Sequence, residues 1–170
     1  MILSVHAVFG AAVASLVPNH PVEAFSIAFV SHFALDMIPH KDYHLISLEA
    51  DLDHKPQIAE TIYRKFRLIR DMTLVSFDAL LGVCLAFLFF FNPIHPSIFL
   101  IGVVGSLLPD FFIFLYIMLK HRSLELFAHF HCSLIHSKII LNLNQITGVL
   151  VQFCTIAILI AILFGVKALI

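Results

Sequence analysis

The sequence predicts an all-α integral membrane protein with about five transmembrane helices and one short interfacial helix. Of its 170 residues, 61% are hydrophobic and 12% are charged, whereas soluble domains average about 45–50% and about 25%. The mean hydropathy of +1.01 points the same way. A soluble fold of this size would leave a large apolar area in contact with water, so we expect lipid around it.

Five apolar stretches cover most of the chain, at residues 2–17, 22–38, 72–91, 96–119 and 146–170. A spanning helix needs about 20 apolar residues, with a range of about 17–25. The last three stretches are long enough, the second is marginal and the first is short. The first lacks the positively charged start of a signal peptide, so we expect a retained helix. Residues 1–170 are expected to form a single domain.

The basic residues orient the predicted bundle. With five spans, the N-terminus and the connections 39–71 and 120–145 lie on one side of the membrane. That side holds nine of the ten Lys and Arg residues, and only Lys167 lies on the other. Cytoplasmic loops carry such an excess. We therefore expect an inner (plasma) membrane protein with a cytoplasmic N-terminus.

The two long connections have structure of their own. Residues 58–69 place apolar side chains at helical spacing and basic ones elsewhere, which predicts an interfacial helix or a packed cytoplasmic helix. Residues 123–143 are apolar enough to dock on the bundle. The chain has no Lys/Arg-rich block that would indicate nucleic acid, and its three scattered cysteines suggest no disulfide framework.

Possible metal ligands gather at the end of the second stretch. His32 and Asp36 lie four residues apart, so both face the same side of a helix. Pro39 then ends that helix and is followed by His40 and Asp42. Imidazole and carboxylate are ligands that Zn²⁺, Mn²⁺ and Fe²⁺ accept. The pattern favours a metal site over a purely structural polar cluster.

Other apolar stretches contribute ionisable residues, which are costly in a membrane and indicate function there. His6 lies four residues before Gly10, a spacing that lets a neighbouring helix approach closely. Asp78 lies inside the third stretch, where it is either functional or bonded to a neighbouring helix. Asp110 follows Pro109, and a proline within a helix opens room for a polar cavity.

Histidines also recur in the second connection. If residues 119–137 form one helix, His129 and His136 share a stripe with His121 and Glu125, while His131 lies nearly opposite. This arrangement favours His129 and His136 as ligands over His131. A break in the helix would reverse that preference, so the choice among the three stays open.

These motifs resemble those of a family of membrane-bound metal-dependent hydrolases, which includes proteins described as LexA-binding, inner-membrane-associated hydrolases. The matching motifs are His6-x-x-x-Gly10, SHFALDMIPHKD at residues 31–42, GSLLPD at 105–110, and His136-Ser137. The resemblance implies a divalent metal, zinc above all, and hydrolytic activity. It carries the family's site to His6, His32, Asp36, His40, Asp42, Asp110 and His136.

The leading hypothesis is therefore a zinc-dependent hydrolase of the inner membrane. Its metal would be held by His32, Asp36, His40 and Asp110, with His6 and a histidine of the second connection. Asp42 or Asp78 would act as general base. The expected substrate is an amphiphilic ester or phosphoester, for example a phospholipid, by analogy with the family. The alternatives are a metal-ion or proton transporter and a non-catalytic metal-binding or structural membrane protein.

Overall fold

A computed structural model of the chain describes residues 1–40, 43, 45, 58–135 and 144–169. These residues form helices and turns, with no strand among them, so the predicted all-α class is confirmed. The elements in order are α1 (Leu3–Ala14), α2 (Pro21–Asp36), α4 (Ile58–Phe90), α5 (Pro96–Leu119), α6 (Arg122–His129), the π-helix η2 (Phe130–Ile135) and α7 (Gln145–Leu169).

Three of the helices are long and apolar enough to cross a membrane, namely Phe66–Phe90 within α4, Pro96–Leu119 (α5) and Ile146–Gly165 within α7. α1 has 12 residues and α2 has 16. At about 1.5 Å per residue they are about 18 and 24 Å long, which is shorter than the hydrocarbon core of about 30 Å. All five predicted stretches are thus helical, and three have the length of a span.

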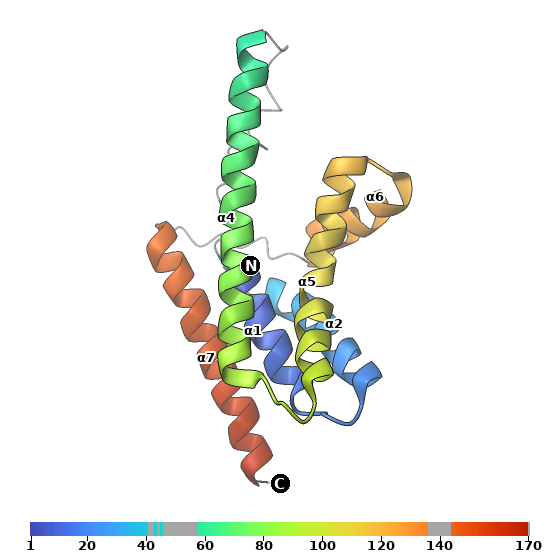
Figure 1. Ribbon diagram of the computed structural model, residues 1–170, viewed down its shortest axis with the longest axis vertical. Coiled ribbons are helices and arrows are strands. Elements are labelled where there is room, and N and C mark those ends of the chain that lie inside the picture. Colours follow the sequence, from blue (N-terminus) through green and yellow to red (C-terminus); the bar gives the residue numbers. More distant parts are fainter. Residues whose placement is uncertain (41–42, 44, 46–57, 136–143, 170) are drawn as a thin grey trace.

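The prediction of a separate interfacial helix at residues 58–69 is wrong. These residues form the first part of α4, which continues without interruption for 33 residues. No proline or glycine separates the amphipathic segment from the apolar one, so nothing in the sequence ends the helix between them. In Figure 1 this part of α4 extends well beyond the other helices.

The central helix of the bundle is α1. Every residue from Ser4 to Ala14 is buried, and α1 contacts α2, α4, α5 and α7 (Figure 1). A helix that is apolar on all sides is stable only when it is enclosed. The start of α1, including His6, therefore lies inside the molecule rather than at its surface.

Glycines allow α1 and α5 to pack closely. A Cβ atom on Gly10 would lie 2.6 Å from the carbonyl oxygen of Gly102, and one on Gly102 would lie 2.7 Å from the Cβ atom of Ala14. Real Cβ atoms essentially never approach that closely. Small residues at such positions let two helix backbones meet. This close contact brings the middle of α5, including Ser106, against α1.

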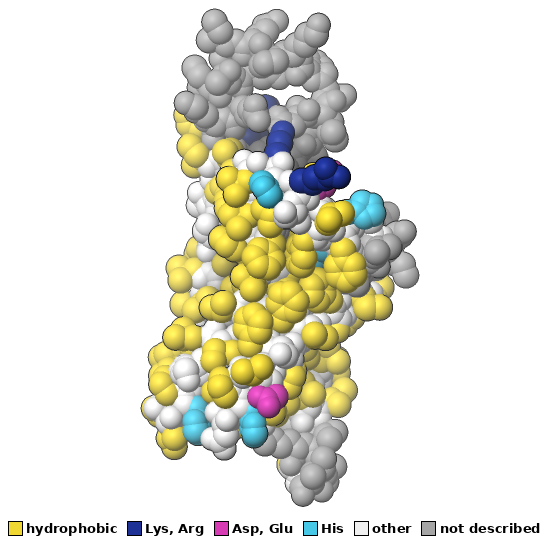
Figure 2. All heavy atoms as spheres, turned by 90° about the vertical axis from the view of Figure 1, so that its right-hand side faces the viewer, with side chains coloured by type: hydrophobic (Ala, Val, Ile, Leu, Met, Phe, Trp, Pro, Cys, Tyr) yellow, Lys and Arg dark blue, Asp and Glu magenta, His cyan; other side chains and the backbone are white. Residues whose placement is uncertain are grey.

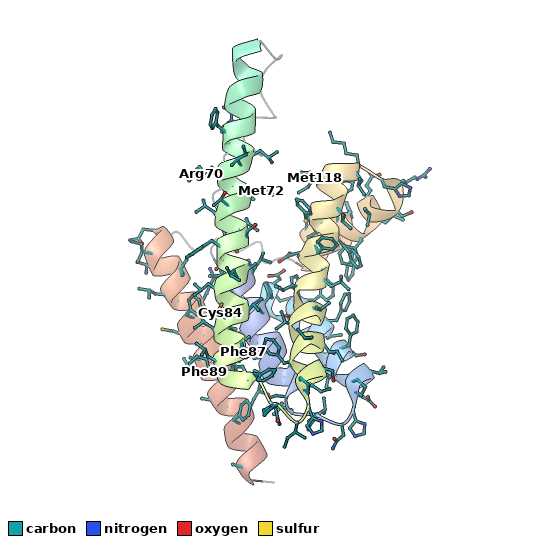
Figure 3. All side chains as sticks on the ribbon, in the orientation of Figure 1. Arg70, Met72, Cys84, Phe87, Phe89 and Met118 are labelled. Carbon is teal, nitrogen blue, oxygen red and sulfur yellow. The ribbon has the colours of Figure 1, made fainter. Side chains whose placement is uncertain are left out.

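The surface is apolar around its middle and polar toward its ends. Figure 2 shows a broad band of hydrophobic side chains, with Lys and Arg beyond one edge of it, an acidic side chain beyond the other, and His beyond both. On α4, Arg70 lies on the part of the helix that extends away from the bundle, whereas Phe87 and Phe89 lie at the opposite end (Figure 3). This distribution is typical of a protein with lipid around its middle.

Candidate metal centre

Two side chains of the site come from one turn of α2. His32 and Asp36 lie four residues apart, with His32 Nε2 3.2 Å from Asp36 Oδ2. Their exposed fractions are 0% and 1%. Burial of a carboxylate is costly without partners, and Asp36 is enclosed by polar groups from several elements. The spacing that predicted a shared face is thus confirmed.

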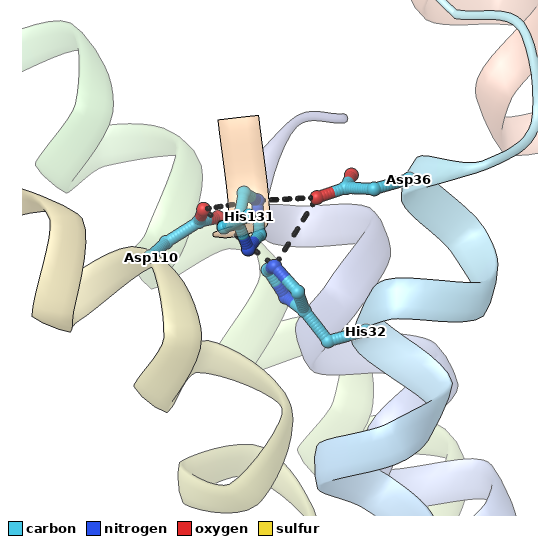
Figure 4. A group of neighbouring side chains, drawn as sticks. All are labelled: His32, Asp36, Asp110 and His131. Carbon is cyan, nitrogen blue, oxygen red and sulfur yellow. Dashed lines mark ion pairs between the residues drawn. The ribbon is translucent and has the colours of Figure 1, made fainter. Parts of the chain in front are cut away.

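Asp110 of α5 and His131 of η2 complete a group of four. His131 Nε2 lies 2.9 Å from Asp36 Oδ2, and His32 Nε2 lies 3.6 Å from Asp110 Oδ1. One candidate ligand atom from each of the four residues lies within 4.8 Å of all the others (Figure 4). We call these four residues, His32, Asp36, Asp110 and His131, the four-residue group.

The tautomer of His32 shows why this group suits a cation. Nδ1 of His32 lies 2.8 Å from the carbonyl oxygen of Ser106. A carbonyl only accepts, so Nδ1 carries the hydrogen and the neutral ring has its lone pair on Nε2. That buried Nε2 atom has no hydrogen-bond partner among the described residues. It faces two carboxylates, and only a cation or a proton placed between them makes that arrangement favourable.

The donor set fits a transition metal. Two imidazoles and two carboxylates are a composition that Zn²⁺, Mn²⁺ and Fe²⁺ accept. Metal-bound histidines usually donate their second N–H to a carbonyl or carboxylate, as His32 does to Ser106. Pro109, within α5, has no N–H to donate to the carbonyl of Gly105, the residue before Ser106. The helix bonding of α5 is therefore already interrupted next to the Ser106 carbonyl. The residues can hold a metal ion, and the choice of metal stays open.

His6 lies directly beside the four-residue group. Its ring stacks on that of His32, with centroids 4.0 Å apart, and its Nε2 atom lies 3.2 Å from Asp36 Oδ1. The side chain is fully buried, and neither ring nitrogen has a hydrogen-bond partner among the described residues. His6 is thus close enough to join the site, as predicted, although it is not one of the four converging residues.

His40 lies one contact further away. Its Nδ1 atom donates to the carbonyl oxygen of Ile38 at 2.6 Å, and its Nε2 atom lies 2.8 Å from the main-chain nitrogen of Met1. That nitrogen also lies 2.8 Å from Asp36 Oδ1. His40 therefore contacts the partner of Asp36 and is not part of the converging group.

Asp78 has a different position from the other carboxylates. Its Oδ2 atom accepts from the main-chain nitrogen of Ser4 at 2.9 Å and from the hydroxyl of Tyr43. The nitrogen of Leu3 donates to the same hydroxyl at 2.8 Å. Burial, and then the bond to Asp78, raises the pKa of Tyr43 above its usual value, which keeps the hydroxyl protonated as a donor.

A side chain of α7 completes this arrangement. Gln152 is buried, and its Oε1 atom accepts from the nitrogen of Ile2 at 3.1 Å. The first N–H groups of a helix have no partner within the helix, so side chains of three other segments satisfy those at the start of α1. Sequence reasoning missed Tyr43 and Gln152, because no spacing rule links a helix start to residues so distant in sequence.

The structure reverses the preference between His129 and His131. α5 ends at Leu119, Lys120 adopts a φ of 49°, and a separate helix begins at Arg122. The next turn is the wider π-helix η2. His131 is therefore buried at the four-residue group, whereas His129 is exposed. One continuous helix over residues 119–137 was the wrong premise.

Asp42 and His136 lie outside the described residues, so their predicted roles stay predictions.

Comparisons of the chain with protein-family models, curated proteins and solved structures find no match. Function must therefore be inferred from the residues of the site themselves. The described part of the site offers four converging nitrogen and oxygen ligands, three of them buried, inside a bundle of helices.

Proposed function

We propose that this protein is a divalent-metal-dependent hydrolase, with zinc as its metal, that acts on an amphiphilic ester or phosphoester at the cytoplasmic face of the inner membrane. The observation that carries the proposal is the buried Nε2 atom of His32, which faces Asp36 and Asp110 with no hydrogen-bond partner among the described residues. Buried polar atoms without a partner are rare. A metal ion at this point would satisfy His32 and both carboxylates together.

Hydrolysis is the chemistry that this ligand set suits best. His32, Asp36, Asp110 and His131 would hold the ion, and with one further position left to water, zinc would lower the pKa of that water to about 7. Three of these residues are at most 1% exposed, whereas Asp110 is 28% exposed. The Asp110 side is thus where water and substrate would reach the metal, and catalytic sites need such an open position.

The general base is assigned to Asp42, which stays a prediction from the sequence. Asp78, the other candidate, bonds to Ser4 and Tyr43 at the start of α1. The Oδ2 atom of Asp78 is thus taken up by two donors that belong to the start of α1 and its surroundings. We therefore treat Asp78 as a residue that holds α1 in place.

The membrane placement follows from charge and length. We propose five inserted helices, with α1 enclosed by the bundle, α2 beside it as a second short helix, and the N-terminus in the cytoplasm. The sequence places nine of ten basic residues on one side, which supports this orientation. Asp110 precedes the end of α5 by nine residues, or about 14 Å along the helix. An amphiphile could bring its polar group to that depth while its chains stay in lipid.

Metal content and hydrolysis should be measured on the same protein. The full chain would be purified in detergent, its zinc counted by elemental analysis, and its activity followed with a fluorescent phospholipid and with bis(p-nitrophenyl) phosphate. We expect about one bound zinc or more, activity that chelation removes and zinc restores, and loss of both metal and activity in His32→Ala. The matched control is His129→Ala, because this exposed histidine ends α6, two residues before His131.

Two outcomes would overturn the proposal. Protein that binds no divalent metal at micromolar concentration would remove the metal centre. Protein that binds zinc, hydrolyses neither substrate and carries zinc across liposome membranes would instead be a transporter.

A further inference from the structure

The ring of Phe33 lies beside both histidines of the four-residue group, whose own ring centroids are 5.0 Å apart. Phe33 follows His32 in α2, and its centroid lies 5.5 Å from that of His32 and 5.5 Å from that of His131. The first contact is edge-to-face, with an interplanar angle of 81°. Aromatic rings favour this geometry. One side chain therefore contacts a ligand candidate on α2 and another on η2.

Phe33 also contacts the arm that carries His131. We call α6 together with η2 the arm. The centroid of Phe33 lies 6.3 Å from that of Phe127 on α6 and 5.9 Å from that of Phe130 on η2. Phe127 in turn meets Phe112 of α5 edge-to-face at 5.3 Å. These four rings, Phe33, Phe112, Phe127 and Phe130, form an aromatic cluster that joins the arm to α2 and α5.

The position of the arm is not set by a continuous helix. α5 ends before Lys120, whose φ of 49° turns the chain, and α6 has only eight residues. So short a helix is marginal without tertiary packing. The residues before His131 therefore depend on side-chain contacts for their place. Among the described residues, Phe33 makes three ring contacts from α2 to the arm, and the pair His32 and His131 makes another.

A metal site is sensitive to such placement. Ligand atoms must be held within about 0.5 Å of the productive geometry, and rotamers locked by packing hold them there. His131 is buried, with its Nε2 atom 2.9 Å from Asp36 Oδ2. On the other side, Phe33 packs against both the His131 ring and the Phe127 side chain one helical turn earlier.

We propose that Phe33 is a positioning residue of the metal centre, which docks the arm through the aromatic cluster and thereby delivers His131 to the ion that His32 and the carboxylates hold. This inference rests on the proposed metal-dependent function. Phe33 acts through His131 and does not touch the metal. Loss of its ring should therefore remove one ligand from the coordination sphere and leave the other three in place.

The test compares Phe33→Ala with Phe29→Ala in the full-length protein. Phe29 lies one turn earlier on α2, is also partly buried, and contacts Phe33 and Phe25. Cobalt(II) replaces zinc as the probe, because its visible absorption reports the number and kind of ligands. We expect Phe33→Ala to weaken cobalt binding at least about tenfold and to change the spectrum to that of His131→Ala, while Phe29→Ala keeps the wild-type spectrum.

A double variant separates positioning from a general loss of stability. If Phe33 acts through His131, then Phe33→Ala should weaken cobalt binding no further when His131 is already alanine. Phe33→Leu, which keeps an apolar side chain of similar reach, provides a folded protein if the alanine variant does not fold, and should show the same spectral change in part.

The outcomes distinguish the two proposals. Wild-type protein that binds no cobalt contradicts the metal-dependent function itself. Wild-type protein that binds cobalt, with Phe33→Ala and Phe33→Leu retaining its affinity and spectrum, contradicts the positioning role alone. Equal losses in Phe33→Ala and Phe29→Ala, or additive losses with His131→Ala, would also overturn that role.

Discussion

The carboxylate of Asp78 accepts a hydrogen bond from the main-chain nitrogen of Ser4, with 2.9 Å between Oδ2 and nitrogen. This bond joins the middle of α4 to the first turn of α1. It places a part-buried carboxyl group at the positive end of the α1 helix dipole. The start of α1 would otherwise bury N–H groups without partners. Side chains of other elements therefore fix the position of α1 in the bundle, and with it the position of His6.

Substitutions of Asp78 separate this anchoring role from catalysis. Asp78→Ala leaves the N–H of Ser4 and the hydroxyl of Tyr43 without their acceptor, so we expect it to lower the free energy of unfolding by about 1–3 kcal/mol. Asp78→Asn keeps an acceptor oxygen and should cost less. Unfolding of the purified proteins in mixed micelles, followed by circular dichroism, measures both.

The same pair tests the general base. A base must lose its function when the carboxylate becomes an amide, whereas a helix anchor keeps much of its own. Hydrolysis that disappears in Asp78→Asn with no change in stability would return Asp78 to the catalytic role that the sequence first suggested.

The packing of α1 against α5 gives a second prediction, on Gly10. A Cβ atom there would lie 2.6 Å from the carbonyl oxygen of Gly102, so Gly10→Ala must push the two helices apart. We expect a loss of about 1–3 kcal/mol in the free energy of unfolding, typical of overpacking. Ser106 also lies against Gly10, and its carbonyl orients His32, so zinc affinity should fall too.

Gly165→Ala is the matched control, since nothing lies within 4 Å of a Cβ atom at that position. Both variants would be compared by thermal unfolding and by zinc competition with a chromophoric chelator. If Gly10→Ala behaves like Gly165→Ala in both measurements, then α1 and α5 do not pack as described.

Much of the fold could be predicted, because the lengths of the apolar stretches and the positions of the prolines determine where the helices lie. α5 has the predicted bounds, since Pro96 stands at its first turn, where proline is favoured. The shared face of His32 and Asp36 follows from helical spacing alone. The unbroken α4 was missed because its amphipathic start and apolar remainder look like two separate segments.

The choice of His131 could not be read from the sequence. A stripe at 3.6 residues per turn assumes a regular helix, and two local features break that assumption: the left-handed Lys120 and the π-helix η2. π-helical turns have no reliable sequence signature and are frequent at functional sites. The anchors of α1, Tyr43 and Gln152, depend on tertiary contacts and were equally beyond the reach of spacing rules.

The buried and the exposed histidine of the arm give a third prediction. His131→Ala removes a candidate ligand that is 1% exposed, whereas His129→Ala removes an exposed ring two residues away. Loss of an outer-shell partner already costs 10–100-fold in metal affinity, so we expect His131→Ala to weaken zinc binding by at least about that much and His129→Ala to leave it unchanged. Calorimetric titration of zinc into metal-free protein measures both, and equal affinities would remove His131 from the metal centre.

The membrane orientation gives the last prediction. The α4–α5 turn and the α5–α6 turn lie at opposite ends of α5, so a protein that spans the membrane exposes them on opposite sides. Ile94 is 79% exposed in the first turn, and Ser123 is exposed after the second.

In a background with Cys84, Cys132 and Cys154 replaced by serine, we expect an impermeant maleimide to label Ile94→Cys in intact cells. Ser123→Cys should react only after the cells are permeabilised, because its turn adjoins the basic residues Lys120 and Arg122. The reverse pattern would invert the orientation and move the proposed site to the outer face, and labelling of both positions in intact cells would argue that α5 does not cross the membrane.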